Sequence, residues 1–115
     1  EPTLKAKLES GIDIVAEDYW GTGVAWGMGA GVDKDFLLEL NGKFLREDLA
    51  LLFVGKRFES GIEESHLHEQ DKEFIKRVAK AHLDLARQFN WNTIDANGSI
   101  EEVRERVWEE VKKIL

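Results

Sequence analysis

Aromatic and acidic side chains that could contact a ligand gather in one short stretch of the sequence. Asp18 follows a β-branched run, Tyr19 and Trp20 come directly after it, and Trp26 lies in the glycine-rich segment beyond. Because the carboxyl ends of strands in open α/β sheets border the ligand crevice, Asp18 would face that crevice. Tryptophan rings can stack on a base or another flat ring. The alternatives are a solvated turn for Asp18 and, for the tryptophans, a place in the core or in a self-association surface.

A second group of side chains with ligand chemistry is the pair His66 and His68. On an extended segment the two imidazoles would lie on one side, beside acidic residues, and could hold zinc or nickel weakly. A dedicated metal site needs three or four convergent ligands, so simple exposure is the plainer interpretation. The chain has no cysteine, and its histidines form no pattern with a nucleophile. We therefore assign neither a metal site nor a catalytic residue.

The apolar pattern predicts helices that alternate with strands. Helical spacing marks the helices, and β-branched or continuously apolar runs mark the strands. Helices are expected at 3–10, at 33–42, at 71–89 and after Ser99, and strands at 12–16, 49–54 and 91–96. This order is typical of an α/β fold with a small, mainly parallel sheet of about three strands. We expect residues 1–115 to form a single domain.

Several local signals refine these elements. Asp33 is a plausible helix N-cap, and Ser99 with Glu102 forms a capping-box pattern. The helix at 71–89 and the last helix each carry an apolar stripe, which we expect to be buried. The stripes are Phe74, Val78, Ala81, Leu85 and Phe89 in the first, and Ile100, Val103, Val107, Val111 and Ile114 in the second, with Trp108 beside it.

The segment from Gly21 to Gly31 contains five glycines. Glycine loses more backbone entropy than other residues when it becomes helical, so this segment should not form a good helix unaided. Two interpretations stay open. The segment is either a mobile loop or a stretch whose backbone lies close against something else.

Composition excludes several classes of function. The 115 residues carry 16 basic and 23 acidic side chains, a formal net charge of −7, which argues against a general nucleic-acid-binding protein. No apolar run approaches the ~20 residues that span a bilayer, so we expect no membrane contact. The chain shows no signal-peptide pattern and no cysteine, and a cytoplasmic protein is the expectation.

Five stretches, taken in order and spacing, resemble the C-terminal two-thirds of thymidylate kinases. They are Leu-Glu-Ser-Gly-Ile-Asp-Ile-Val at 8–15, Gly-Val-Asp-Lys-Asp-Phe-Leu-Leu-Glu-Leu-Asn at 31–41, Glu-Asp-Leu-Ala-Leu-Leu-Phe at 47–53, the helical pattern at 72–86, and Ile-Asp-Ala-Asn-Gly-Ser-Ile-Glu-Glu-Val at 94–103. The resemblance implies the core of a P-loop kinase. Its activity would be transfer of a phosphoryl group from ATP to dTMP.

The chain departs from this family where the chemistry takes place. The family's P-loop, G-x-x-x-x-G-K-[ST], lies upstream of the matching stretches and does not occur in these 115 residues. Asp18-Tyr19-Trp20 stands where the family has Asp-Arg-Tyr, so the phosphate-holding arginine is missing. The polar segment that follows in the family is glycine-rich here, at 21–27. The family's lid carries arginines, and at most Lys56 and Arg57 correspond to them in this sequence.

These departures leave three hypotheses. The first is a non-catalytic or redesigned binding module for a dTMP-like nucleotide or another planar ligand. The second is a fragment or subunit of an active dTMP kinase, with ATP and magnesium bound only if a P-loop is supplied elsewhere. The third is a self-associating scaffold without a ligand. The four tryptophans of this short chain also favour a homo-oligomer. The predicted ligand-binding residues are Asp18, Tyr19, Trp20, Trp26 and Arg57.

Overall fold

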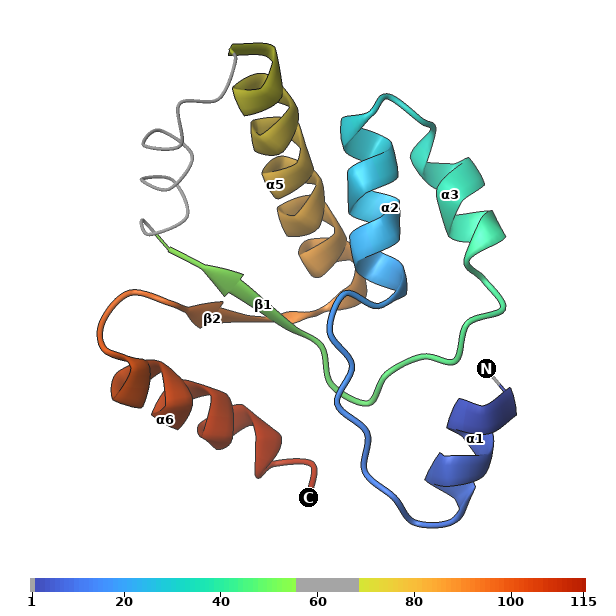
Figure 1. Ribbon diagram of the computed structural model, residues 1–115, viewed down its shortest axis with the longest axis vertical. Helices are drawn as coiled ribbons and strands as arrows, with labels where there is room; N and C mark the ends of the chain where they lie inside the picture. The colour runs from blue at the N-terminus through green and yellow to red at the C-terminus, as the bar shows by residue number, and fades with distance from the viewer. Residues whose placement is uncertain (1, 56–68) are drawn as a thin grey trace.

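The computed structural model describes residues 2–55 and 69–115 of the chain. Arg57, His66 and His68 lie outside the described residues, so the predictions made for them stay predictions. The helices are α1 (Pro2–Glu9), α2 (Trp20–Gly29), α3 (Lys34–Leu40), α5 (Glu69–Phe89) and α6 (Ile100–Val111), and the strands are β1 (Leu51–Val54) and β2 (Asn92–Asp95). In Figure 1, α2 and α5 lie side by side on one side of the strands and α6 lies on the other.

The sheet of the described residues consists of β1 and β2, which run parallel. Its register pairs Leu51 with Asn92 and Val54 with Asp95. The α/β class is confirmed, but the expected third strand at 12–16 is wrong, because this segment has no regular secondary structure and does not join the sheet. Ile12 and Val15 are 51% and 99% exposed. β-branched residues favour a strand through packing against neighbours on a sheet, and the described residues offer this segment none.

The hydrophobic core lies between α2 and α5. Its fully enclosed members are Val24 and Ala25 of α2 and Leu85 of α5, with Trp20 and Ala81 nearly so. The predicted stripe of α5 is confirmed, since Val78, Ala81 and Leu85 are buried and Phe74 and Phe89 are partly buried. The two helices therefore hold most of the buried apolar surface of the described residues, and the sheet holds little of it.

Helix α2 forms from the glycine-rich segment because its glycines allow close packing. A Cβ added at Gly29 would lie 2.5 Å from Cγ2 of Val78, and one at Gly27 would lie 2.7 Å from Cδ1 of Leu37. A Cβ at Gly21 would overlap the Trp91 ring. The interpretation as a mobile loop is wrong, and the interpretation as a backbone pressed against other elements is confirmed. Tertiary contact outweighs the poor helix propensity of this stretch.

The ends of α3 and α6 match the predicted caps. Asp33 accepts a hydrogen bond from the backbone N–H of Phe36. Ser99 and Glu102 form a reciprocal capping box, and the hydrogen bonds from Ser99 to Glu102 hold the pKa of that carboxyl below its ordinary value of 4.5. The expected burial along α6 is only partial, because no residue of the helix is fully buried. Ile100 at its start is 68% exposed, and Ile114, beyond its end, is 51% exposed.

None of the helices in the described residues combines the length and the apolar character needed to cross a membrane.

The role of the glycines can be tested with Gly29→Ala. The added methyl group would overlap Val78, whose backbone nitrogen lies 3.3 Å from the new atom and limits the relief that movement can give. We expect the free energy of unfolding in urea to fall by about 1–3 kcal/mol. Gly23→Ala is the matched control in the same helix, since a Cβ there meets nothing within 4 Å.

The control should raise the free energy of unfolding by about 0.5–1 kcal/mol, because alanine favours the helix over glycine. Equal effects of the two substitutions would contradict close packing of α2 on α5.

Candidate functional site

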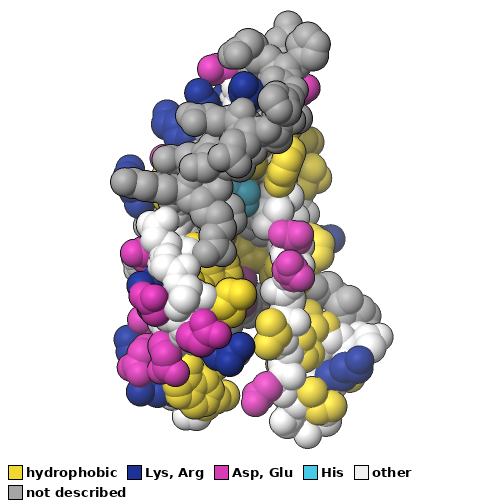
Figure 2. All heavy atoms as spheres, turned by 60° about the vertical axis from the view of Figure 1, so that its left-hand side comes forward, with side chains coloured by type: hydrophobic (Ala, Val, Ile, Leu, Met, Phe, Trp, Pro, Cys, Tyr) yellow, Lys and Arg dark blue, Asp and Glu magenta, His cyan; other side chains and the backbone are white. Residues whose placement is uncertain are grey.

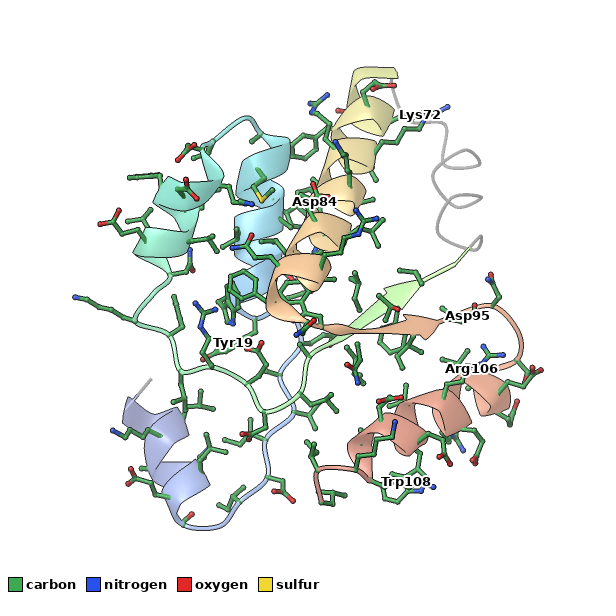
Figure 3. The ribbon with its side chains drawn as sticks, turned by 180° about the vertical axis from the view of Figure 1, so that it is seen from behind. Tyr19, Lys72, Asp84, Asp95, Arg106 and Trp108 are labelled. Atoms are coloured by element: carbon green, nitrogen blue, oxygen red, sulfur yellow. The ribbon has the colours of Figure 1, made fainter. Side chains whose placement is uncertain are left out.

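Asp18 and Tyr19 lie at the entrance to α2. Asp18 is exposed and has a φ of 53°, in the left-handed region. Tyr19 precedes the first turn of the helix in an extended conformation, without capping it through its side chain. Its hydroxyl group donates a hydrogen bond of 2.9 Å to the carbonyl oxygen of Leu45, and its ring contacts Phe44 edge to face. Figure 3 shows Tyr19 at the lower end of α2. The phenol thus ties the start of α2 to the segment before β1.

Trp20 is the largest side chain of the α2–α5 core. Only 4% of its surface is exposed, and its ring meets Phe89 and Trp91 edge to face, with centroids 5.0 and 5.9 Å away. Its Nε1 donates a 2.8 Å hydrogen bond to Oε2 of Glu47. The geometry favours the packing interpretation of Trp20, because little of the ring is open to a ligand.

The guanidinium group of Arg46 packs over the rings of Trp20 and Phe89. Its guanidinium carbon lies 3.9 Å from the centroid of Trp20 and 5.2 Å from that of Phe89. Guanidinium groups are attracted to aromatic faces by the ring quadrupole. Sequence reasoning missed Arg46 and Glu47. Both lie more than 25 residues from Trp20, and no local spacing marks such a long-range pair.

Trp26 lies at the other end of the α2–α5 interface. It is 47% exposed, and its ring contacts Phe74 with centroids 5.4 Å apart and planes tilted by 54°. Trp20 contacts Phe89 at the end of α5, whereas Trp26 contacts Phe74 near its beginning. The two tryptophans therefore do not line one crevice. Among the predicted residues, the structure brings together Asp18, Tyr19 and Trp20, and it places Trp26 about two turns away along α2.

A separate open hollow lies where α5 ends and β2 begins, with a volume of about 430 Å³. It contains none of the predicted site residues. Its lining is Leu83, Ala86, Arg87, Asn90, Trp91, Asn92 and Thr93. The indole Nε1 of Trp91 is buried and has no hydrogen-bond partner among the described residues. Sequence reasoning missed this hollow, because its shape depends on how the chain turns from the end of α5 into β2.

The chemistry that these residues offer is stacking and hydrogen bonding. Within residues 2–55 and 69–115, no three histidine, cysteine, aspartate or glutamate side chains converge as metal ligands. The exposed ring of Trp26 and the carboxylate of Asp18 are available to a ligand, whereas Trp20 and Tyr19 are engaged in contacts within the chain. The charged side chains near Trp20 are Asp18, Arg46 and Glu47, and the exposed Trp26 ring lies at the other end of α2.

The hydrogen bond between Trp20 and Glu47 can be tested with Glu47→Ala and the control Glu47→Gln. Alanine leaves the buried indole N–H unpaired, which costs about 1–3 kcal/mol. Glutamine keeps an oxygen that can accept the bond, so it should cost markedly less. The measurement is urea unfolding followed by tryptophan fluorescence. Equal losses for the two variants would contradict a role for this acceptor in holding Trp20.

Comparison with known proteins identifies the family. The family model described as thymidylate kinase matches residues 1–107. The chain is 29% identical to a probable thymidylate kinase of Methanocaldococcus jannaschii over 105 residues, 89% of this chain and 55% of that protein. It is 31% identical to a probable thymidylate kinase of Thermococcus gammatolerans over 106 residues, 87% and 51% of the two chains.

A probable thymidylate kinase of Sulfurisphaera tokodaii is 28% identical over 108 residues, 90% of this chain and 57% of the relative. No solved structure was found to match. The chain thus spans about half the length of the curated relatives it matches. The core helices, the two parallel strands and the family match together show that this chain belongs to the thymidylate kinase family.

Proposed function

We propose that this chain is the nucleoside-monophosphate-binding portion of a thymidylate kinase and does not transfer a phosphoryl group by itself. The observation that carries the proposal is the family match over residues 1–107, which corresponds to about half of each relative. The relatives are named as probable thymidylate kinases. The substrate class proposed for the assembled protein is therefore ATP with dTMP.

Transfer of a phosphoryl group depends on positioning the phosphates and neutralising their charge. The 115 residues contain no G-x-x-x-x-G-K-[ST] sequence, so this chain lacks the lysine and the hydroxyl that such a loop aims at the phosphates and at magnesium. The described residues also provide no cluster of metal ligands. We propose that the remaining portion of the kinase supplies the groups that hold ATP and magnesium.

The ligand surface that this chain would contribute centres on Trp26. Nearly half of this side chain is exposed, and Phe74 supports its ring from α5. A thymine ring can stack on such a surface. Tyr19, at the entrance to α2, stands where the family's phosphate-binding arginine is expected, and its hydroxyl group, which donates to the carbonyl oxygen of Leu45, supplies no positive charge for a phosphate. We therefore expect weak binding of dTMP by the chain alone.

A second candidate function is binding of an uncharged planar ligand without any transfer step. The observation that favours it is the exposed Trp26 ring, which lies at the opposite end of α2 from Asp18. A planar ligand without phosphate would stack on Trp26 and would need no phosphate-binding group beside it. The experiment below distinguishes the two candidates by comparing dTMP with thymidine.

The test is a fluorescence titration of the purified chain with dTMP, thymidine and ATP. We expect a saturable change with dTMP, no effect of ATP, and no formation of dTDP when ATP and magnesium are added. Trp26→Phe should lose the fluorescence change and weaken binding about tenfold, on the basis of ~1–3 kcal/mol for a stacked base. Trp108→Phe is the matched control, because Trp108 on α6 is 49% exposed, close to the 47% of Trp26.

A stronger response to thymidine than to dTMP would favour the second candidate. Formation of dTDP by the chain alone would contradict the proposal directly. A flat response to all three ligands would contradict ligand binding at Trp26, as would an equal loss of response in the two tryptophan variants.

A further inference from the structure

The open hollow at the end of α5 lies away from the surface proposed to bind the nucleotide. Its lining runs from Leu83 on α5 to Thr93 on β2, so it borders the amino end of that strand. Open α/β sheets bind their ligands outside the carboxyl ends of the strands, which here lie at Val54 and Asp95. The volume of about 430 Å³ falls within the range of small-molecule sites. The hollow is therefore a second, separate candidate for a ligand site.

The turn at the rim of the hollow is held in place by the end of α5. Asn90 follows the helix with a φ of 55°, in the left-handed region that asparagine tolerates. The backbone N–H of Trp91 then donates a 2.9 Å hydrogen bond to the carbonyl oxygen of Ala86. This bond reaches back five residues, as in a Schellman helix end. The backbone thus fixes the rim, and the side chains of the rim are not needed to hold it.

The charged group of the lining is a guanidinium, and no carboxylate belongs to the lining. Arg87, in the last turn of α5, is exposed and forms no ion pair or hydrogen bond with the other described residues. Glu110 reaches the lining from α6, where its carboxylate accepts a 2.7 Å hydrogen bond from Asn92. The same carboxylate pairs with Lys113 at 3.2 Å. Its charge is therefore already compensated, and that of Arg87 is not.

This lining contrasts with the rest of the surface. The chain carries 23 acidic side chains against 16 basic ones. Figure 2 shows acidic side chains gathered on the lower part of one face, where the glutamates of α6 lie. A guanidinium group offers planar, paired donors to a carboxylate. Because Arg87 finds no such partner among the described residues, it is available to an anion from outside the chain.

Trp91 gives a second, independent indication of a ligand. Its Nε1 is buried and has no hydrogen-bond partner among the described residues, and an unpaired buried donor is destabilising. The ring is fixed, since it stacks on Phe89 and a Cβ at Gly21 would overlap it. Nε1 is closed to solvent, so an acceptor reaches it after a neighbouring side chain moves. Arg87 and Asn90 are exposed at the rim and can move without losing a hydrogen bond within the described residues.

We propose that this hollow binds a small organic anion in which a carboxylate is attached to an apolar body. The carboxylate pairs with Arg87 and accepts the indole N–H of Trp91. The apolar body covers Leu83, which is 40% exposed, and Ala86. The carbonyl groups at the end of a helix repel an anion, so the charge of Arg87 decides whether the ligand binds. The site shares no residue with the Trp26 surface and does not depend on the proposed function.

The test uses the full 115-residue chain and three probes of similar shape, benzoate, benzamide and benzylamine, at one ionic strength. NMR resolves the indole N–H signals of the tryptophans, and Trp91→Phe identifies the signal of Trp91. We expect benzoate to shift this signal saturably, benzamide to bind at least about tenfold more weakly, and benzylamine not to bind. The signals of Trp20, which is already bonded to Glu47, and of Trp26 should stay in place.

Arg87→Gln tests the role of the charge. Glutamine favours the helix about as well as arginine and keeps a hydrogen-bond donor, so the main loss is the positive charge. We expect the affinity for benzoate to fall at least about tenfold. Arg104→Gln is the matched control, because Arg104 is also an exposed helical arginine and does not line the hollow. Circular dichroism checks that both variants fold, and the comparison of benzoate with benzamide needs neither variant.

Four results would overturn the inference. The first is an unchanged Trp91 signal at the highest benzoate concentration, and the second is equal binding of benzoate and benzamide. The third is an equal loss of affinity in the two arginine variants. The fourth is binding of inorganic phosphate as tight as that of benzoate, because the apolar body would then contribute nothing. None of these results bears on dTMP binding at Trp26, so failure of this site is distinguishable from failure of the proposed function.

Discussion

Close contact between α2 and α5 is the interaction on which the rest of the described structure depends. Gly29 and Gly21 let the α2 backbone approach Val78 and Trp91 to distances that a methyl group would prevent. This approach places Val24 and Ala25 against Ala81 and Leu85, and it buries Trp20 at the end of the interface. A short helix with four glycines is unstable alone, so α2 forms because it packs against α5.

The position of the core between α2 and α5 determines which apolar side chains are buried and which stay exposed. Two helices pack well against each other, while β1 and the segment at 12–16 leave apolar side chains uncovered. The exposed Trp26 ring, where we propose ligand binding, lies on this pair of helices, and we propose that the groups that hold ATP come from the part of the relatives that this chain does not match.

Elements with strong local signals could be predicted from the sequence. The stripe of α5, the cap at Asp33 and the capping box at Ser99 depend on residues within a few positions of one another. The failures depend on distant partners. The segment at 12–16 has the composition of a strand but no neighbouring strand, and α2 has poor propensity but a close neighbour. Tyr19 and Trp20 were predicted from their residue types to bind a ligand, which stays a prediction, and no local pattern marks their packing partners at 45–47.

Amide hydrogen exchange of the isolated chain under native conditions tests the central claim most directly. If the α2–α5 interface carries the stability of the fold, the slowest exchange should occur in the amides of Val24, Ala25, Ala81 and Leu85. Exchange in β1 should be faster, because an open two-stranded sheet separates before the helices do. Exchange that is slowest in β1 and β2 would contradict this account and would place the stability of the chain in its sheet.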